Sequence, residues 1–163
     1  MEILNNFNTS VEKALSEIDK KWRRYDGLII CGTHSPSNTE FMIDRIAEAR
    51  KSGRPFLGIC AGYQLTAIEF ARHVLSIKDA TSEEFGEGTF VVKKLPELNV
   101  GLKNGESYWN WYEVDSSVVL QLEQDTPENF FITQSHPEYQ SSKEKPHPLL
   151  VNFLNYAKSK MAM

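Results

Sequence analysis

Several patterns that mark specialised classes of protein are missing from this sequence of 163 residues. It has only two cysteines, Cys31 and Cys60, and no C-x-x-C pair, so a framework of disulfides is excluded. It also has no H-E-x-x-H motif, and nothing else in it indicates a metal site. We therefore expect neither a metal nor another cofactor.

Long hydrophobic runs and basic runs are missing as well. No apolar segment approaches the roughly 18 residues that span a membrane, and the first six residues lack the basic and apolar regions of a signal peptide. The net charge is −4, which argues against nucleic acid or an anionic membrane surface as a partner. We expect a cytoplasmic protein in which both thiols are reduced.

The sequence does contain an alternation of short apolar runs and helical patterns, which predicts a single α/β domain over residues 1–163. Continuous apolar runs are typical of strands buried on both faces, and strands that alternate with helices pair in parallel. Parallel sheets place functional loops at the carboxyl ends of their strands, where Cys31 and Cys60 are expected to lie. The predicted helices span 10–23, 41–50, 64–75 and 149–158, and the predicted strands span 27–31, 55–60, 89–93, 108–114 and 130–134.

The most informative segment surrounds Cys60, which ends a predicted strand and lies between Gly58 and Gly62. A G-x-C-x-G turn at a strand–helix junction is typical of a nucleophile elbow, which holds one side chain up at the end of the strand. The helix that follows would direct backbone N–H groups and its positive dipole end toward the sulfur, and both favour a thiolate. Taken alone, Cys60 could equally be a packed core cysteine. The two glycines favour the elbow, because they permit a tight turn and close approach of another backbone.

A histidine and a carboxylate that could serve this thiol lie far along the chain, in His136-Pro137-Glu138. Pro137 favours an extended conformation at His136, and in an extended segment residues two apart point the same way. We therefore expect Glu138 to lie beside the imidazole and fix its tautomer, as the third member of a catalytic triad. A solvated surface turn is the competing interpretation of this tripeptide, but in combination with the elbow it indicates covalent acyl transfer.

Among the remaining histidines, only His34 is a candidate for the pocket, because it follows the strand next to Cys60. We expect no role for His73, which lies on a helix, or for His147, which lies between prolines. Cys31 is expected to be a packed strand residue rather than a second nucleophile.

The sequence resembles the class I (triad) glutamine amidotransferases, and most closely the glutaminase domain of CTP synthase. The resemblance runs from about Tyr25 to the last predicted helix, and it implies a flavodoxin-like three-layer sandwich with a mainly parallel central sheet. It is carried by Leu57-Gly58-Ile59-Cys60-x-Gly62-x-Gln64, by Ile68-Glu69-Phe70-Ala71-Arg72-His73-Val74 with Glu84-Phe85, by Tyr112-Glu113-Val114, and by Gln134-x-His136-Pro137-Glu138-Tyr139 with Pro148-Leu149.

The resemblance implies thiolate attack on the γ-carboxamide of glutamine or a related γ-glutamyl compound. Ammonia would leave, and water would hydrolyse the thioester. A separate synthetase subunit is the partner that would use the ammonia. By position, the resemblance implies that Cys60 is the nucleophile, that His136 is the general base and that Glu138 orients His136. It implies that N–H groups of Ala61 and of the Gly32–Thr33 loop bind the oxyanion. It also implies that Gln64 and Glu84 contact bound glutamine.

The sequence departs from the family pattern in three places. Only one glycine, Gly32, remains in the oxyanion loop, and a positive φ at Thr33 would be strained. Trp109 and Trp111 replace part of a basic run that includes an arginine for the substrate α-carboxylate, and they form either a packed aromatic face or a reshaped pocket wall. The family's opening strand and helix are not found before residue 10, so we expect a fold shortened at the N-terminus, with residues 1–4 as one residual strand.

These departures leave two other functions open. The chain could be a stand-alone γ-glutamyl hydrolase that transfers no ammonia. It could also be a degenerate domain that binds or regulates without catalysis, in which case no thioester would form on Cys60.

Overall fold

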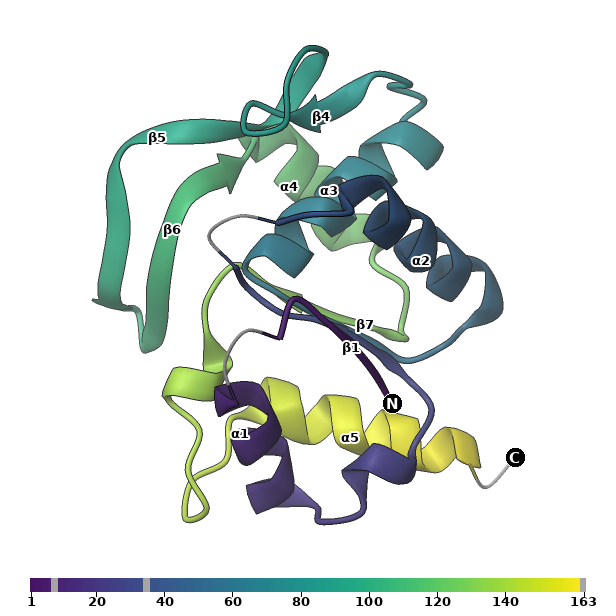
Figure 1. Cartoon of the computed structure of the whole chain (residues 1–163), viewed down its shortest axis with the longest axis vertical. Coiled ribbons are helices and arrows are strands. Elements are labelled where there is room, and N and C mark those ends of the chain that lie inside the picture. The colour runs from purple at the N-terminus through teal and green to yellow at the C-terminus, as the bar shows by residue number, and fades with distance from the viewer. Residues whose placement is uncertain (7–8, 34–35, 162–163) are drawn as a thin grey trace.

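Four short parallel strands form the middle layer of the fold in the computed structural model, which describes residues 1–6, 9–33 and 36–161. The elements in chain order are β1 (Glu2–Leu4), α1 (Ser10–Ile18), η1 (Trp22–Arg24), β2 (Leu28–Ile30), α2 (Thr39–Ser52), β3 (Phe56–Ile59), α3 (Ala61–His73), β4 (Ala80–Ser82), β5 (Thr89–Lys103), β6 (Glu106–Val114), α4 (Ser116–Asp125), β7 (Phe130–Thr133), η2 (Pro137–Tyr139) and α5 (Pro148–Met161). The middle sheet has the order β1-β2-β3-β7. Figure 1 shows α1 and α5 on one face of this sheet and α2, α3 and α4 on the other.

The apolar composition of the central strands explains why helices cover both faces. In β2, Leu28 and Ile30 pack into the cluster that contains α2 and α3, whereas Ile29 packs against α1 and α5. All three side chains are fully buried, and each contributes roughly 1.5–3 kcal/mol relative to an exposed position. The predicted three-layer, mainly parallel α/β architecture is therefore confirmed, and so is the residual strand at residues 1–4.

The predicted helix over residues 10–23 is shorter than expected, because α1 ends at Ile18. Asp19 has an extended backbone (φ −151°, ψ 113°), and its side chain accepts hydrogen bonds from the Lys21 N–H at 2.9 Å and the Tyr25 hydroxyl at 2.5 Å. A short acidic side chain that bonds locally competes with the helical pattern. The chain therefore turns at Asp19 and resumes as the separate turn η1.

The sequence did not predict β4, α4 or the full length of β5. The strands β4 and β5 belong to a second sheet of order β4-β5-β6. In it, β5 and β6 form a long antiparallel hairpin that extends beyond the three layers (Figure 1). α4 begins after Asp115, whose carboxylate accepts the N–H of Ser117 at 3.2 Å, as an N-cap does. Within the described ranges, no helix is both long enough and apolar enough to cross a bilayer.

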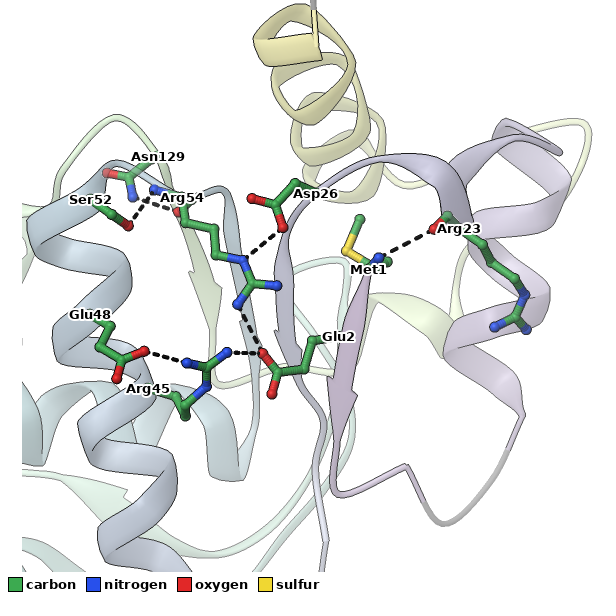
Figure 2. A network of polar contacts seen from close by, with 9 residues as sticks. All are labelled: Met1, Glu2, Arg23, Asp26, Arg45, Glu48, Ser52, Arg54 and Asn129. Atoms are coloured by element: carbon green, nitrogen blue, oxygen red, sulfur yellow. Dashed lines mark hydrogen bonds and ion pairs between the residues drawn. The ribbon is translucent and has the colours of Figure 1, made fainter.

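The amino ends of the parallel strands are joined by ion pairs and hydrogen bonds (Figure 2). Glu2, at the start of β1, accepts from Arg45 of α2 and from Arg54, the latter at 2.9 Å. Arg54 also donates to Asp26 at 3.0 Å, and Asn129 donates to the Arg54 carbonyl at 2.7 Å. The hydrogen bond from Arg45 lowers the pKa of the Glu2 carboxyl, with burial opposing the shift and Arg54 adding to it. This edge of the sheet is therefore held by charge pairing.

Candidate active site

The carboxyl ends of β2, β3 and β7 meet at the opposite edge of the central sheet. Cys60 comes directly after β3, Gly32 follows β2, and His136 follows β7. The Cys60 N–H donates to the carbonyl of Thr133 at 2.9 Å, which extends the β3–β7 pairing to the candidate nucleophile. Parallel pairing therefore brings together three segments that are far apart in the sequence.

The backbone at Cys60 has the geometry of a strand–helix elbow. Its φ of 55° and ψ of −103° lie outside the regions that a non-glycine residue normally occupies, and its carbonyl accepts the N–H of Gln64 at 3.1 Å as α3 begins. Gly62 is required by close packing, because a Cβ there would lie 2.3 Å from the carbonyl oxygen of Ile30. The first turn of α3 thus lies directly against the end of β2 and holds Cys60 at the edge of the sheet.

His136 and Glu138 are in direct contact. The imidazole Nδ1 lies 2.9 Å from the carboxylate Oε2, and both side chains are buried. The contact was predicted, but the expected extended segment is wrong, because residues 137–139 form the 3-10 turn η2. Pro137 occupies the first position of this turn, where its missing N–H costs no hydrogen bond. The His136 N–H donates to the Ser107 carbonyl at 2.7 Å, which attaches this segment to β6.

The sulfur and the imidazole converge at Gly32. A Cβ on Gly32 would lie 2.9 Å from both the Cys60 Cβ and the His136 Cε1, and 3.5 Å from the Cys60 Sγ. The His136 Nε2 is buried and forms no hydrogen bond with any described residue. With Nδ1 bound to Glu138, Nε2 is the ring nitrogen that remains available to the sulfur.

The surroundings of His136 favour its charged form. Burial alone would lower its pKa, but the Cys60 and Glu138 side chains outweigh burial and raise the pKa of His136 to about 10. The ring also stacks on Tyr139, with centroids 4.6 Å apart and an interplanar angle of 12°. Burial raises the pKa of Tyr139 as well, with smaller contributions from Glu138 and Cys60. Cys60 and Glu138 therefore favour the protonated form of the imidazole, which has the Tyr139 phenol ring against one face.

Two further groups contact the Cys60 sulfur. Sγ lies 3.7 Å from the carbonyl oxygen of Trp109, and the Gln134 Nε2 lies 3.6 Å from Sγ. The contact with Trp109 shows that β6 passes over the sulfur. Trp111, on the same face of β6, is 41% exposed. The two tryptophans therefore do not form a fully packed aromatic face.

Gln64 and Glu84 are the predicted substrate contacts; Gln64 contacts the Tyr112 carbonyl, and the charge of Glu84 acts on the Tyr112 side chain. The Gln64 Nε2 donates to the Tyr112 carbonyl at 2.9 Å and to the Gln134 Oε1 at 3.2 Å. Glu84 lies in the turn after β4, where burial raises its pKa. Burial also raises the pKa of Tyr112, and the charges of Glu84 and Glu83 add to this shift. The structure thus places Gln64 one side chain away from the sulfur.

The predicted oxyanion groups flank Cys60. Ala61 is the first residue of α3, and Gly32 contacts Cys60 from the β2 side. Thr33 is not among the described non-glycine residues with a positive φ, so the strain considered for this residue is not found. His34 lies outside the described residues.

A polar cluster beside His136 was not predicted. Glu106, at the start of β6, accepts from the His147 Nε2 at 2.8 and 3.0 Å and from the Ser135 hydroxyl at 3.1 Å. The Leu149 N–H donates to the His147 Nδ1 at 3.1 Å, so Nε2 carries the proton. His147, for which the sequence predicted no role, is therefore connected to the segment that carries His136. No motif joins Glu106 to His147, because the contact depends on how β6 and α5 pack.

Cys31 is a packed thiol, as predicted. It is buried, its N–H donates to the Leu4 carbonyl at 3.0 Å, and burial raises the pKa of its thiol to about 12. In the parts of the chain that the structure describes, no three histidine, cysteine or acidic side chains are grouped so that they could hold a metal ion.

Comparison with known proteins gives a consistent result. The sequence model of the class I glutamine amidotransferases matches residues 4–156. CTP synthase of Methanoculleus marisnigri is 33% identical over an alignment that is 179 residues long, gaps included, and that covers 82% of this chain and 34% of the relative. CTP synthase 1-B of Xenopus laevis is 48% identical over 82 residues, which cover 49% of this chain and 14% of that protein. The chain therefore spans about a third of the length of the archaeal relative.

The fold matches a solved glutaminase domain. The Trypanosoma brucei CTP synthase glutaminase domain with bound acivicin superimposes with a TM-score of 0.77, covering 96% of this chain and 92% of that chain. The sequences are 18% identical over this match, so it concerns the fold alone.

Proposed function

The chain belongs to the class I glutamine amidotransferases, and on this premise we propose that it hydrolyses the γ-carboxamide of glutamine or a related γ-glutamyl amide through a thioester on Cys60. The observation that carries the proposal is the convergence of the Cys60 sulfur and the His136 ring at Gly32, with Glu138 bound to the far side of the ring. This arrangement supports an activated nucleophile, a proton carrier and an orienting acid.

The charged state of His136 supports a definite order of proton transfers. Because the pKa of His136 is raised to about 10, the imidazolium holds the proton at neutral pH and the sulfur attacks as its partner thiolate. The S–C bond forms while the carbonyl oxygen becomes an oxyanion, for which the N–H groups of Ala61 and the Gly32–Thr33 loop are the proposed donors. As the C–N bond breaks, His136 gives its proton to the leaving nitrogen, which departs as ammonia or an amine.

The thioester is then hydrolysed by the reverse sequence. Neutral His136 takes a proton from water, the hydroxide oxygen attacks the carbonyl carbon, and the C–S bond breaks to regenerate the thiolate. Glu138 keeps Nδ1 protonated throughout, so that Nε2 alone exchanges the proton. Gln64 and Glu84 remain the proposed contacts for the glutamyl portion.

The fate of the ammonia depends on a partner. If ammonia is the useful product, an acceptor-activating synthetase subunit has to bind near Cys60, because free ammonia is otherwise lost to water. A γ-glutamyl hydrolase that works alone, and a domain that only binds, are the other outcomes of the experiment below.

Covalent labelling tests the proposal directly. A glutamine-analogue diazoketone should add one equivalent to Cys60, as read by peptide mass spectrometry, and the adduct should be absent in Cys60→Ser. Cys31→Ser should label normally, because the Cys31 thiol is buried. Cys60→Ala should abolish turnover and leave the circular dichroism spectrum unchanged.

Product analysis separates the three functions. Release of glutamate and ammonia from glutamine supports the amidotransferase. Turnover of other γ-glutamyl amides, but not of glutamine, indicates the stand-alone hydrolase. No adduct with any γ-glutamyl electrophile indicates a binding domain and ends the proposal.

A further inference from the structure

A chain of side-chain amides leads from the Cys60 sulfur to the β5–β6 hairpin. We propose that Gln134 is a catalytic residue that donates a hydrogen bond to the thiolate of Cys60, and that Gln64 is the positioning residue that orients it. The role in turnover rests on the function proposed above, whereas the effect on the sulfur can be measured without turnover.

A single main-chain carbonyl determines the orientation of these amides. The Tyr112 carbonyl can only accept, so Gln64, at 2.9 Å, must turn its NH₂ group toward it. The same NH₂ group lies 3.2 Å from Gln134, which must therefore present its oxygen. The NH₂ group of Gln134 is then left to face Sγ at 3.6 Å. The reverse orientation would place two donors against each other.

The hairpin continues the same pattern on the other side of Tyr112. The Asn110 NH₂ donates to the Tyr112 carbonyl at 2.9 Å, so its oxygen faces Asn99, which donates at 3.1 Å. The oxygen of Asn99 in turn accepts from the Lys103 ammonium. Hydrogen bonds in series polarise one another, so each contact strengthens the orientation of the next.

Burial makes this arrangement effective. Gln64 is 9% exposed and Asn110 is 4% exposed, whereas Gln134 and Asn99 are half-buried, so water has limited access to the contacts nearest the sulfur. A hydrogen bond from an N–H group to an ionised acceptor is stronger than one to a neutral acceptor, so the contact stabilises the thiolate more than the thiol. The amide carries no charge and does not titrate near neutral pH. It can therefore support the thiolate without replacing His136 as the proton carrier.

The polarity of the hairpin agrees with this role. Asn99, Lys103, Tyr108 and Asn110 share one face of the ribbon and, together with Gln134, line an open pocket of about 330 Å³. Asn110 is buried, Asn99 and Tyr108 are half-buried, and Lys103 is exposed. The opposite face of the ribbon carries Val100, Leu102 and Trp111, which are 50%, 67% and 41% exposed. A strand that only covered a core would bury its apolar face and expose its polar face. Here the buried face holds the amides that lead to the sulfur.

Alkylation of the full chain by iodoacetamide tests the proposal, because the rate follows the thiolate fraction of Cys60. In Gln134→Leu, we expect the pH of half-maximal rate to rise by about one unit, so that the rate constant on the acidic limb of the pH profile falls about tenfold. In Gln134→Glu, which keeps the shape of the side chain but adds a negative charge, the alkylation rate constant should fall at least as far. The titratable groups around the sulfur, His136, Glu138 and Tyr139, are unchanged in both variants.

Gln121→Leu is the matched control. Gln121 is exposed on α4, where its side chain donates a hydrogen bond to the Ser117 carbonyl of the same helix. The alkylation profile of Gln121→Leu should therefore equal that of the parent. Peptide mapping keeps Cys60 separate from Cys31. Equal profiles for the parent, Gln134→Leu and Gln134→Glu would overturn the proposal.

A measurement on the parent chain covers the case in which the variants do not fold. The side-chain amide protons of Gln134 should shift in nuclear magnetic resonance spectra as Cys60 titrates, and this shift should vanish in Cys60→Ala. Amide signals that do not respond to Cys60 would contradict the contact. If the Gln134 variants slow alkylation but the parent turns over no γ-glutamyl amide, the proposed function fails and the support of the thiolate by Gln134 stands.

Discussion

The two edges of the central sheet are built from different interactions. At the amino edge, Glu2 is held by Arg45 and Arg54 (Figure 2). At the carboxyl edge, the contacts come from main-chain groups, neutral amides and two histidine–carboxylate pairs, His136–Glu138 and His147–Glu106. All six arginines of the chain lie between residues 23 and 72, and none follows.

This difference shows how the fold separates stability from chemistry. Guanidinium–carboxylate pairs satisfy one another, so the groups at the amino edge have little capacity left to react. At the carboxyl edge, the His136 Nε2 is buried without a hydrogen bond to any described residue, and Cys60 has a strained backbone. Such features cost stability and are typical of functional sites. Changes at the carboxyl edge should therefore reduce activity, and changes at the amino edge should reduce stability.

His136→Asn should have the largest effect. Asparagine keeps a polar side chain but cannot carry the proton between sulfur and the leaving nitrogen, so we expect turnover to fall by several orders of magnitude. The measurement is kcat with the γ-glutamyl amide that the parent hydrolyses, together with urea unfolding. A rate within tenfold of the parent would show that another group acts as the base.

Gly32→Ala should reduce turnover about 100-fold, because displacement of reacting groups by about 1 Å has effects of this size. The added methyl group would lie 2.9 Å from both the Cys60 Cβ and the His136 Cε1 and force them apart. Gly53→Ala is the control: its φ of 77° makes alanine strained, but no atom lies within 4 Å of the new Cβ. It should lower stability alone. Equal kcat for Gly32→Ala and the parent would mean that the two groups do not meet at this point.

Glu106→Gln should reduce kcat about tenfold and leave KM nearly unchanged. Ser135 and His147 both donate to Glu106 Oε1, and an amide oxygen in that place can still accept from them. The NH₂ group that replaces Oε2 would lie 3.0 Å from the His147 N–H, so two donors would face each other. The Ser135–His136 segment should then be held less firmly against β6. Glu144→Gln, an exposed change in the loop before α5, should have no effect on kcat. A change in KM alone would assign Glu106 to substrate binding instead.

Glu2→Gln should have the smallest effect and should act on stability. We expect a loss of about 1 kcal/mol of unfolding free energy at pH 7, because the ion pairs of Glu2 are partly exposed. The pKa of Glu2 is lowered in the folded state, so its contribution is present above the unfolded pKa and is lost as pH falls through the folded pKa. The difference between parent and variant should therefore shrink in acid, while kcat at pH 7 stays unchanged. A loss of activity without loss of stability would contradict the separation of the two edges.

The sequence predicted those parts of the site that depend on local geometry. The elbow at Cys60 follows from glycines two residues away on each side. The contact between His136 and Glu138 was predicted from an extended segment, but the turn η2 produces it. The front half of the sheet was predicted because each strand is an unbroken apolar run. The catalytic roles of Cys60, His136 and Glu138 are predictions that the experiments above test.

The hairpin and its contacts could not be predicted in the same way. The predicted strand over 89–93 continues to Lys103, but the inward residues of this extension are polar and the outward ones are apolar, so hydropathy gives no sign of burial. The amide contacts join residues separated by up to 74 positions, such as Gln134 and Cys60. Such contacts depend on how the hairpin folds over the sheet, which no local pattern records.

The attachment of His136 to β6 has a mechanical consequence. The Ser107 carbonyl holds the N–H of His136 and the Trp109 carbonyl contacts the sulfur of Cys60, so neighbouring positions on one strand touch both members of the pair. One strand of the hairpin, β6, thus contacts both of the proposed reacting groups, Cys60 and His136. A displacement of the hairpin is therefore expected to reach the proposed nucleophile and the proposed proton carrier together.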